Sequence, residues 1–326
     1  MKFSKSSLMK GLLLFLVLML SVSLITGCGG STTEESNAPE GEGTEDGDKS
    51  DVVIKVGSKD FTEQLILGQI TILALQDAGF TVEDKTNVAG SDKVRSALVN
   101  GEIDIYWEYT GTGWLVHLQH DNAITDPEEA YAKVKEEDAA NNIVWLDYAP
   151  LDNTYTIMMT KEDSEALGIE TISQLGEYVN QNPNKIIFAG DHEYTVRPDG
   201  LPALEDCYGY SFGANNIKVM EMGLVYKALK DKQINAGMGF ATDGRIAAFD
   251  LVNLKDDKQF FPVYNGCPVI RKDVLDANPE IADILNPISA KLDTATMTEL
   301  NYQVDIEEKR PEVVAKEWLQ AEGFIK

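Results

Sequence analysis

Lys59 lies where an apolar run is expected to pass into a helix. It belongs to the stretch GSKDFTEQ (57–64), which follows the apolar run 52–56 and opens a segment with helical apolar spacing. The backbone N–H groups at the start of a helix favour an anion, and a nearby lysine adds positive charge. The pattern suggests a group that binds an anion, although a solvated loop lysine would show the same sequence.

Aromatic and polar residues gather in five short stretches rich in glycine, proline, asparagine and aspartate. The stretches are YWEYTGTGW (106–114), LDNTYTI (151–157), VRPDG (196–200), GFATDGR (239–245) and FFPVYNGCP (260–268). Such compositions favour tight turns, and the face of an aromatic ring attracts cations that carry no hydrogen-bond donors. Any one tyrosine could simply pack in the core. Five such stretches together favour a binding site.

The residues needed for catalysis or metal binding are scarce. The three histidines are His117, His120 and His192, and no further cluster of histidine and cysteine supports a metal site. The chain has no serine in a glycine elbow and no phosphate-binding loop. Cys207 and Cys267 could pair, but they are more typical of small apolar groups. We therefore expect no enzyme activity, no cofactor and no metal.

The elements that must hold these residues alternate between strands and helices. The patterns predict strands at 52–56, 80–88, 103–107, 155–160, 185–189 and 234–240, apolar runs within 260–270, and helices at 61–78, 92–100, 173–180, 221–230, 278–285, 296–304 and 311–322. This order predicts parallel sheets with helices on both faces. In open α/β sheets, ligands bind at the carboxyl ends of the strands.

A weak internal similarity relates two parts of the chain. ALVNGEIDIYWEYTG (97–111) aligns with ALKDKQINAGMGFAT (228–242), so that Tyr109 matches Phe240. Each copy is typical of a helix, a tight turn and a strand that ends in an aromatic residue. Two α/β units could be alike by chance. The alternative is two similar lobes that each contribute a ring to a cleft between them.

Length and charge restrict the function classes. The chain has 326 residues, 43% of them hydrophobic, which suffices for one large domain or two ordinary ones. Its formal net charge of -26 disfavours binding to nucleic acid or to an anionic membrane face.

The first 51 residues have the layout of an export signal and a linker. Lysines precede the apolar run 11–20, and small residues precede Cys28, as in the lipobox of bacterial lipoproteins. We expect a lipoprotein signal peptide at 1–27, a lipidated Cys28, and an acidic flexible tether within 28–51. An ordinary signal peptide or a membrane anchor is the alternative.

From about residue 52 onward, the chain resembles the substrate-binding lipoproteins of osmoprotectant ABC importers. The resemblance rests on GSKDFTEQLILG, EYTGTG, DNTYT, RPDG, ATDGRIAAFDL, DDKQFFPVY and NYQVD, in the order of that family. It implies an α/β fold of two lobes, the type II periplasmic-binding-protein clamp, with the ligand cleft between the lobes. Lobe 1 is expected at 52–153 plus 262–326, and lobe 2 at 154–261. The implied location of this protein is outside the cytoplasm, and its implied partners are a small quaternary-amine ligand and an ABC permease with its ATPase. The protein would contact the membrane only through its lipid anchor.

The resemblance also assigns roles to residues. An aromatic cage for the quaternary nitrogen would comprise Tyr109, Tyr155, Phe240 and Tyr264. Groups that hold the ligand's carboxylate, or lie beside the cage, would be Lys59, Thr112, Asn153 and Arg197. Phe240 is a departure, since tyrosine is common at that position in the family.

The implied ligand is glycine betaine, carnitine or a related betaine. Thr112 and two basic residues favour such a zwitterion over choline. A binder of another small zwitterion or amino acid is one alternative; a secreted hydrolase and a sensor lobe are weaker ones. Lys59 and Arg197 could instead form surface or interlobe ion pairs.

Overall fold

The computed structural model describes residues 52–197 and 199–326. The described residues all belong to one compact unit. The predicted signal peptide, the lipidated Cys28 and the tether within 28–51 lie outside the described residues and stay predictions. Among the described helices, none is long and apolar enough to cross a membrane.

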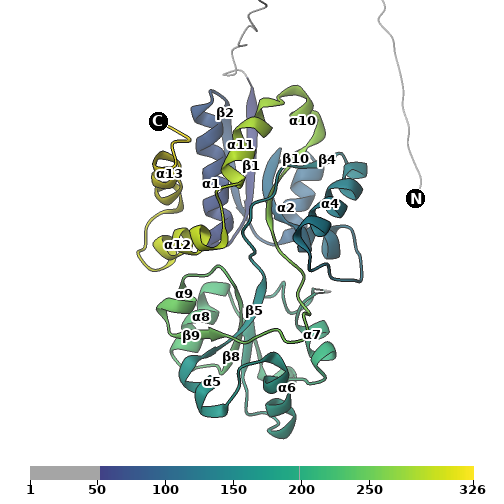
Figure 1. The fold of residues 1–326 in the computed structure, drawn as a ribbon, viewed down its shortest axis with the longest axis vertical. Helices are drawn as coiled ribbons and strands as arrows, with labels where there is room; N and C mark the ends of the chain where they lie inside the picture. The colour runs from purple at the N-terminus through teal and green to yellow at the C-terminus, as the bar shows by residue number, and fades with distance from the viewer. Residues whose placement is uncertain (1–51, 198) are drawn as a thin grey trace, which may run out of the picture. The chain divides into compact units, whose positions relative to one another are not determined.

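The first lobe is built on a five-stranded sheet in the order β2-β1-β3-β10-β4 (Figure 1). Its strands are β1 (Val53–Lys59), β2 (Thr81–Val88), β3 (Ile105–Tyr109), β4 (Ile143–Trp145) and β10 (Gly266–Arg271). β1 is parallel to β2 and β3, whereas β10 is antiparallel to β3 and β4. The first residue of β10, Gly266, pairs with Tyr109 at the end of β3.

The second lobe is built on a five-stranded sheet in the order β7-β6-β8-β5-β9. Its strands are β5 (Tyr155–Thr160), β6 (Phe188–Gly190), β7 (Ile217–Val219), β8 (Ala236–Phe240) and β9 (Leu251–Asn253). β6 is parallel to β7 and β8, and β5 is antiparallel to β8 and β9. Tyr155 at the start of β5 pairs with Phe240 at the end of β8.

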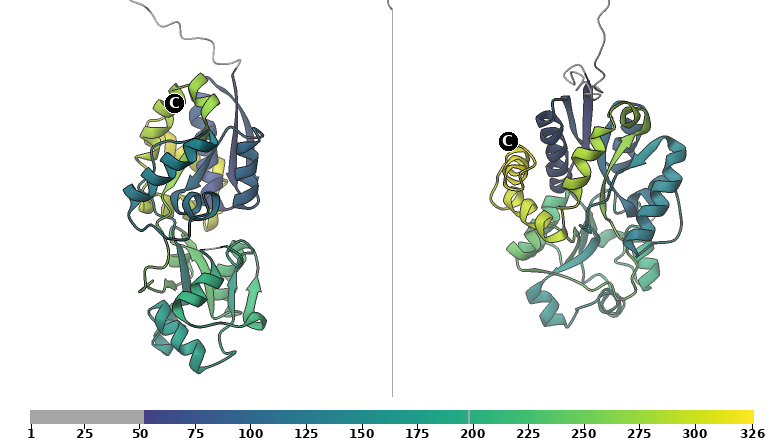
Figure 2. Two further views of the ribbon diagram at one scale, coloured as in Figure 1. Left: turned by 90° about the vertical axis from the view of Figure 1, so that its right-hand side faces the viewer. Right: turned by 45° about the horizontal axis from the view of Figure 1, so that its top comes forward.

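The two sheets have the same plan, in which an antiparallel strand follows three parallel ones. β10 and β5 are these antiparallel strands, and each starts soon after the chain arrives from the other lobe (Figures 1 and 2). The prediction of purely parallel sheets is therefore wrong. β10 and β5 run antiparallel because each starts at the end of the sheet where its neighbour, β3 or β8, finishes. The two-lobe α/β fold itself is confirmed, while the boundaries at 153/154 and 261/262 stay a prediction.

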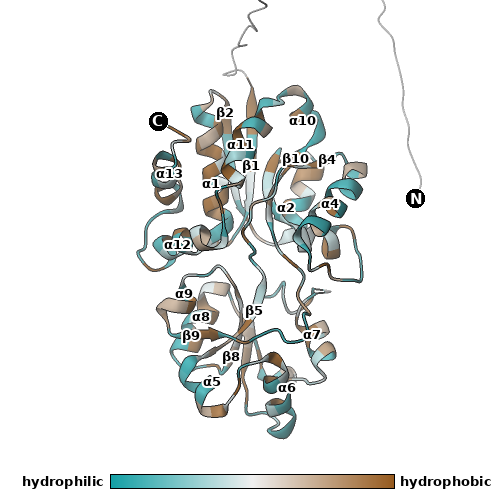
Figure 3. Ribbon diagram, in the orientation of Figure 1, coloured by the Kyte–Doolittle hydropathy of each residue, from teal (hydrophilic) through white to brown (hydrophobic). Residues whose placement is uncertain are grey.

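Among the described residues, seven α-helices longer than one turn flank the first sheet. They are α1 (Thr62–Asp77), α2 (Ser91–Val99), α4 (Pro127–Asp138), α10 (Lys272–Ala277), α11 (Glu280–Ser289), α12 (Thr294–Asp305) and α13 (Pro311–Ala321). α1 contacts β1, β2, α12 and α13, and Figure 3 shows it as hydrophobic along most of its length. A helix buried between a sheet and other helices needs apolar residues on several sides.

The helices that flank the second sheet are α5 (Lys161–Leu167), α6 (Ile172–Gln181), α7 (Leu201–Tyr208), α8 (Met222–Lys230) and α9 (Arg245–Ala248). The Thr160 hydroxyl accepts from the backbone N–H of Asp163 and so caps α5, which starts where β5 ends. Thr171 and Gln174 form a capping box at the start of α6.

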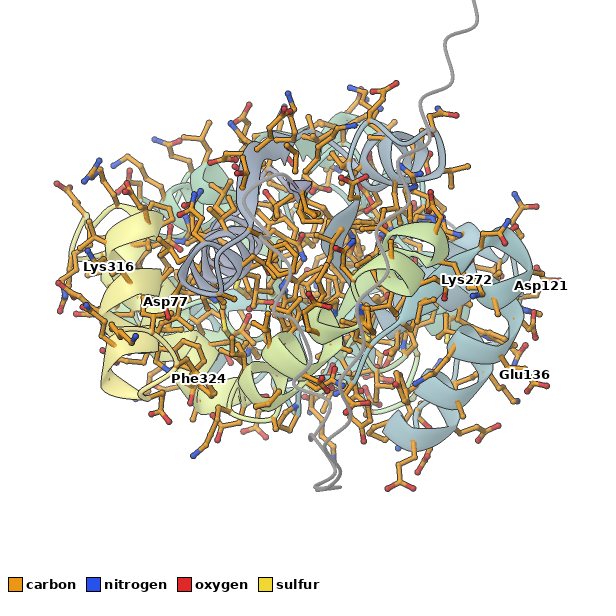
Figure 4. All side chains as sticks on the ribbon, turned by 90° about the horizontal axis from the view of Figure 1, so that it is seen from above. Asp77, Asp121, Glu136, Lys272, Lys316 and Phe324 are labelled. Atoms are coloured by element: carbon orange, nitrogen blue, oxygen red, sulfur yellow. The ribbon has the colours of Figure 1, made fainter. Side chains whose placement is uncertain are left out.

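Charged side chains cover the outside, as expected for a globular unit. Asp121, Glu136, Lys272 and Lys316 are exposed and lie at the edge of the molecule in Figure 4. Cys207 is exposed and Cys267 is buried, and the two are not bonded to each other.

The segment after β3 is tightly packed. A short helix, α3 (Thr110–Thr112), leads into a π-helix over Gly113–His117. A Cβ on Gly111 would lie 2.8 Å from the Tyr264 ring, and one on Gly113 would lie 2.6 Å from Trp145. Glycine is needed at both positions for this close approach. The tight turn brings Thr112 and His117 next to the end of β3.

Candidate functional site

A pocket of about 680 Å³ lies between the two lobes. The first lobe contributes the ends of β1 and β3 and the start of α2, and the second lobe contributes the end of β8 and the loop before α7. All eight predicted site residues line it, namely Lys59, Tyr109, Thr112, Asn153, Tyr155, Arg197, Phe240 and Tyr264. The structure therefore brings the predicted set together, while their roles in ligand binding stay a proposal.

Tyr155 is the centre of the aromatic part of the pocket. Its ring centroid lies 5.2 Å from that of Tyr264 in an edge-on arrangement and 5.5 Å from that of Phe240. Tyr194 and Phe261 pack behind it, with centroids at 5.0 and 6.0 Å. These rings fix one another, because each occupies space that its neighbour could otherwise use.

Phe61 is an aromatic residue of the pocket that was not predicted. Its ring stacks on Phe240 at 5.0 Å and lies 6.3 Å from Tyr109, so it joins the rings of the two lobes. It belongs to the same stretch as Lys59 and directly precedes α1, so the sequence held a signal. Phe61, Asn153 and Phe240 also line a second pocket of about 250 Å³.

Lys59 is held in a buried cluster and does not lie in the strand-to-helix turn where it was expected. It is the last residue of β1, and its Nζ lies 2.6 Å from Oε1 of Glu108. Glu108 Oε2 accepts hydrogen bonds from Tyr106 Oη at 2.9 Å and from His117 Nε2 at 2.8 Å. Burial alone would raise the pKa of Glu108, but the charge of Lys59 and the bond from His117 hold that pKa well below its usual range.

Arg197 is the centre of a second ionic cluster, in the other lobe. Its Nε and Nη2 donate to the two oxygens of Asp199 at 2.7 Å each, and its Nη1 donates to Glu193 at 2.8 Å. Its Nη2 also reaches Thr112 Oγ1 in the first lobe at 3.3 Å. The guanidinium carbon lies 5.3 Å from the centroid of the Tyr155 ring.

Asp199 extends this cluster toward the rings by accepting a hydrogen bond from Tyr264 Oη. Both predicted basic residues thus line the pocket and are also ion-paired, but the Lys59–Glu108 and Arg197–Asp199 pairs are buried and are not the surface or interlobe pairs of the alternative. Each pair lies within its own lobe.

Glu63 joins the lobes behind the pocket. It accepts from Tyr109 Oη at 2.7 Å, from Thr242 Oγ1 at 2.6 Å and from Asn301 Nδ2 at 3.2 Å. Thr242 belongs to the second lobe, and its Oγ1 also lies 2.8 Å from Asn153 Oδ1. Burial raises the pKa of the Glu63 carboxyl, and the bonds from Thr242, Tyr109 and Asn301 oppose this. The predicted residue Asn153 therefore contributes to a polar contact between the lobes.

Another polar contact links the lobes at the rim of the pocket. The backbone N–H of Ser91, at the start of α2, donates to Glu193 Oε2 at 3.0 Å. Within residues 52–197 and 199–326, no group of three or more His, Cys, Asp and Glu side chains could hold a metal ion. His117 contacts Glu108, and His120 contacts Glu137, at 2.8 Å each.

Two α/β lobes with matching strand orders and a pocket between them define a type II periplasmic binding protein. The family model for the substrate-binding domain of ABC-type glycine betaine transport systems matches residues 52–321. The chain therefore belongs to that family. This confirms the predicted resemblance. It also confirms that the chain is an extracytoplasmic binding protein of an ABC transport system, and not an enzyme.

Known relatives cover most of the chain. The glycine-betaine-binding protein of Pseudomonas aeruginosa is 43% identical over 277 residues, which are 83% of this chain and 88% of that protein. The carnitine transport binding protein OpuCC of Listeria monocytogenes is 32% identical over 97% of this chain and 98% of that protein. A crystal structure of a glycine betaine/carnitine/choline ABC transporter has a TM-score of 0.68 at 30% identity and covers 84% of this chain and all of that chain.

Proposed function

We propose that this protein captures a quaternary-amine compatible solute between its lobes and delivers it to an ABC permease. The observation that carries the proposal is a single pocket in which aromatic rings from both lobes adjoin hydrogen-bond donors. Tyr109, Tyr155, Phe240 and Tyr264 are the proposed cage, with Phe61 added from the structure. The relatives named for glycine betaine and carnitine support this assignment.

The chemistry of the rings fits a methylated nitrogen. A quaternary ammonium cannot donate a hydrogen bond, so ring faces hold it through contact and about 0.5–2 kcal/mol of cation–π attraction. A primary ammonium would bring donors that rings leave unpaired, at a cost of about 1–3 kcal/mol for each buried group. The pocket should therefore reject ordinary amino acids.

The polar groups fit a carboxylate at the other end of the ligand. Lys59, Arg197 and Thr112 line the same pocket and carry N–H or O–H donors. We therefore assign glycine betaine, carnitine or a related betaine as the ligand class, ahead of choline. Asn153 lies between the rings and the contact of the two lobes, where it helps to place Tyr109.

Closure of the two lobes on the ligand would produce the form that the permease recognises. We assign lobe 1 to residues 52–153 plus 262–326 and lobe 2 to 154–261, with the two crossings as the hinge. Lipidation of Cys28, after removal of residues 1–27, would tether the protein to the membrane through the acidic segment within 28–51. The lipobox-like sequence before Cys28 supports this assignment.

Titration calorimetry with a ligand panel tests the proposal. Glycine betaine, carnitine and choline should give saturable heats, with the zwitterions tighter, while proline and glutamate should give none. Absence of heat and of thermal stabilisation with every methylated amine at millimolar concentration would overturn the assignment. Mass measurement of the membrane-extracted protein tests lipidation, since an unmodified N-terminal segment would contradict it.

A further inference from the structure

Glu108 is a fully buried acid next to a ring of the pocket, and the proposed function gives it no role. It is 0% exposed and directly precedes Tyr109 in β3. Although Tyr109 and Lys59 line the pocket, Glu108 lies behind them and is not part of the lining. An ionised carboxylate in such a place is costly unless several groups bind it.

Four donors satisfy this carboxylate. Lys59 Nζ and the backbone N–H of Tyr109 donate to Oε1 at 2.6 and 2.7 Å, while Tyr106 Oη and His117 Nε2 donate to Oε2. Three of these donors come from β3 or from the π-helix that follows it, so their positions are set by the local fold. Of these four donors, Lys59 and Tyr109 also line the pocket, and Lys59 is the one that carries the ammonium group.

The pair has two consequences for a ligand. First, Nζ of Lys59 is held at a fixed point, 5.2 Å from the centroid of the Tyr109 ring, so its remaining N–H donors have a defined direction. Second, the charge of Lys59 is compensated before any ligand arrives. On the facing wall, Arg197 is likewise paired with Asp199 and Glu193. The pocket therefore offers donors for a carboxylate without offering an excess of positive charge.

The geometry points to Glu108 as the positioning residue that makes the site specific for zwitterions over anions. This inference rests on the proposed function, because the aromatic rings must bind the positive end of the ligand. A ligand that carries both a carboxylate and a quaternary nitrogen has no net charge, and it meets a pocket wall whose basic groups are already paired with acids. A ligand that has a carboxylate but no quaternary nitrogen carries a net negative charge, and this wall offers it no net positive charge in return. Choline, a cation, likewise meets no net positive charge in this wall, whereas it would meet an uncompensated Lys59 if the charge of Glu108 were removed.

The test uses three ligands that differ mainly in charge. Glycine betaine is the zwitterion, choline is the cation, and the tert-butylacetate anion has carbon in place of the quaternary nitrogen of glycine betaine. Wild type should bind the anion far more weakly than betaine. Glu108→Gln keeps the shape and removes the charge, so it should reduce the preference for betaine over the anion by about tenfold or more and weaken choline. Glu108→Asp, which keeps the charge, should retain the wild-type preference.

Asp138→Asn is the matched control. Asp138 is another buried acid of the first lobe, bound to Arg95 and Trp145 away from the pocket. Its loss should lower stability and leave all affinity ratios unchanged. A Glu108→Gln protein that binds betaine with wild-type ratios for all three ligands would overturn the inference alone. If wild type binds no methylated amine, the proposed function fails instead.

The opposite change covers the case in which Glu108→Gln does not fold. Lys59→Gln leaves the charge of Glu108 uncompensated, so choline should bind more tightly relative to betaine, and the tert-butylacetate anion should lose its binding. Unchanged choline affinity in Lys59→Gln would contradict the role of Glu108.

Discussion

Each lobe contributes one of the two predicted basic residues to the pocket, Lys59 from the first lobe and Arg197 from the second, and each is held in a different way. In the first lobe, Lys59 ends β1 and its partner Glu108 lies on β3 of the same sheet. In the second lobe, Arg197 lies in a loop, with its partners two and four residues away in sequence, at Asp199 and Glu193. Lys59 is thus held by a sheet, and Arg197 by its own loop.

Because of this difference, we expect Lys59 to act in recognition of the ligand and Arg197 to act also in closure of the two lobes. None of the bonds that hold the Lys59 ammonium to Glu108 crosses between the lobes. Arg197, by contrast, reaches Thr112 across the pocket, and its partner Glu193 accepts from Ser91 at the start of α2. We therefore expect changes at Lys59 to alter the ligand preference, and changes at Arg197 to alter binding of every ligand.

Arg197→Ala should have the largest effect. Removal of one partner from a buried ionic cluster leaves Asp199 and Glu193 without their cation, which costs about 3–5 kcal/mol in the free energy of unfolding. It also removes the bond to Thr112, so all quaternary amines should bind more weakly. Urea denaturation and calorimetry measure the two effects.

Arg95→Ala is the control for this prediction. Arg95 binds the buried Asp138 with two nitrogens, outside the pocket. It should lose stability and keep ligand affinity. Equal affinity losses in both variants would remove the distinction between the lobes.

An ionic contact between the lobes predicts a pH effect on stability. Asp305 in α12 of the first lobe lies 3.1 Å from Arg245 of the second lobe, and burial raises its pKa to about 6 despite the charge of that arginine. Between pH about 4 and about 6, the folded protein therefore holds a proton that the unfolded chain has released. The contribution of this group is complete at low pH and is lost as pH rises through that window, by at most about 3 kcal/mol.

The comparison of wild type with Asp305→Asn isolates this group. The free energy of unfolding of wild type minus that of the variant should fall between pH 4 and 6. Asp293, which caps the other end of α12 and has a lowered pKa, is the control, since Asp293→Asn should show no such fall. A flat difference for Asp305→Asn would refute the raised pKa.

Tyr155→Leu should affect binding without regard to ligand charge. Tyr155 contacts four rings that all follow it in the chain, those of Tyr194, Phe240, Phe261 and Tyr264. Loss of its ring face should weaken glycine betaine and choline alike by about 0.5–2 kcal/mol. Unequal losses for the two ligands would show that Tyr155 recognises more than the methylated nitrogen. Tyr208→Leu, at a ring outside the pocket, controls for general destabilisation.

The sequence predicted which residues meet, better than it predicted how they are held. The alignment of Tyr109 with Phe240 placed both rings at strand ends, and β3 and β8 do occupy the same place in their sheets. The antiparallel course of β5 and β10 was missed, because apolar runs have the same composition in either direction.

The buried acids show why part of the site could not be predicted. In the sequence, Glu63 has the pattern of an ordinary acid in the first turn of a helix. In the structure it is buried, and it is hydrogen-bonded to Thr242 and Asn301, which are far away in the chain. Glu108 reads as a solvated residue between aromatics, and its salt bridge spans 49 positions to Lys59. Such partners are set by tertiary packing and leave no local pattern.

The smallest effect is expected for Phe240→Tyr, at a position where the two lobes differ by one hydroxyl. Tyr109 and the equivalent Phe240 both end a central strand, but the hydroxyl of Tyr109 donates to Glu63, while Phe240 has no such group. Tyr109→Phe leaves a buried carboxylate with one donor fewer and should cost about 1–3 kcal/mol in stability. Phe240→Tyr keeps both ring faces and should change stability and betaine affinity by less than about 0.5 kcal/mol. A larger gain in affinity from Phe240→Tyr would mean that the second lobe lacks a polar contact that its ligand could use, and that the lobes are less alike in function than their strand order suggests.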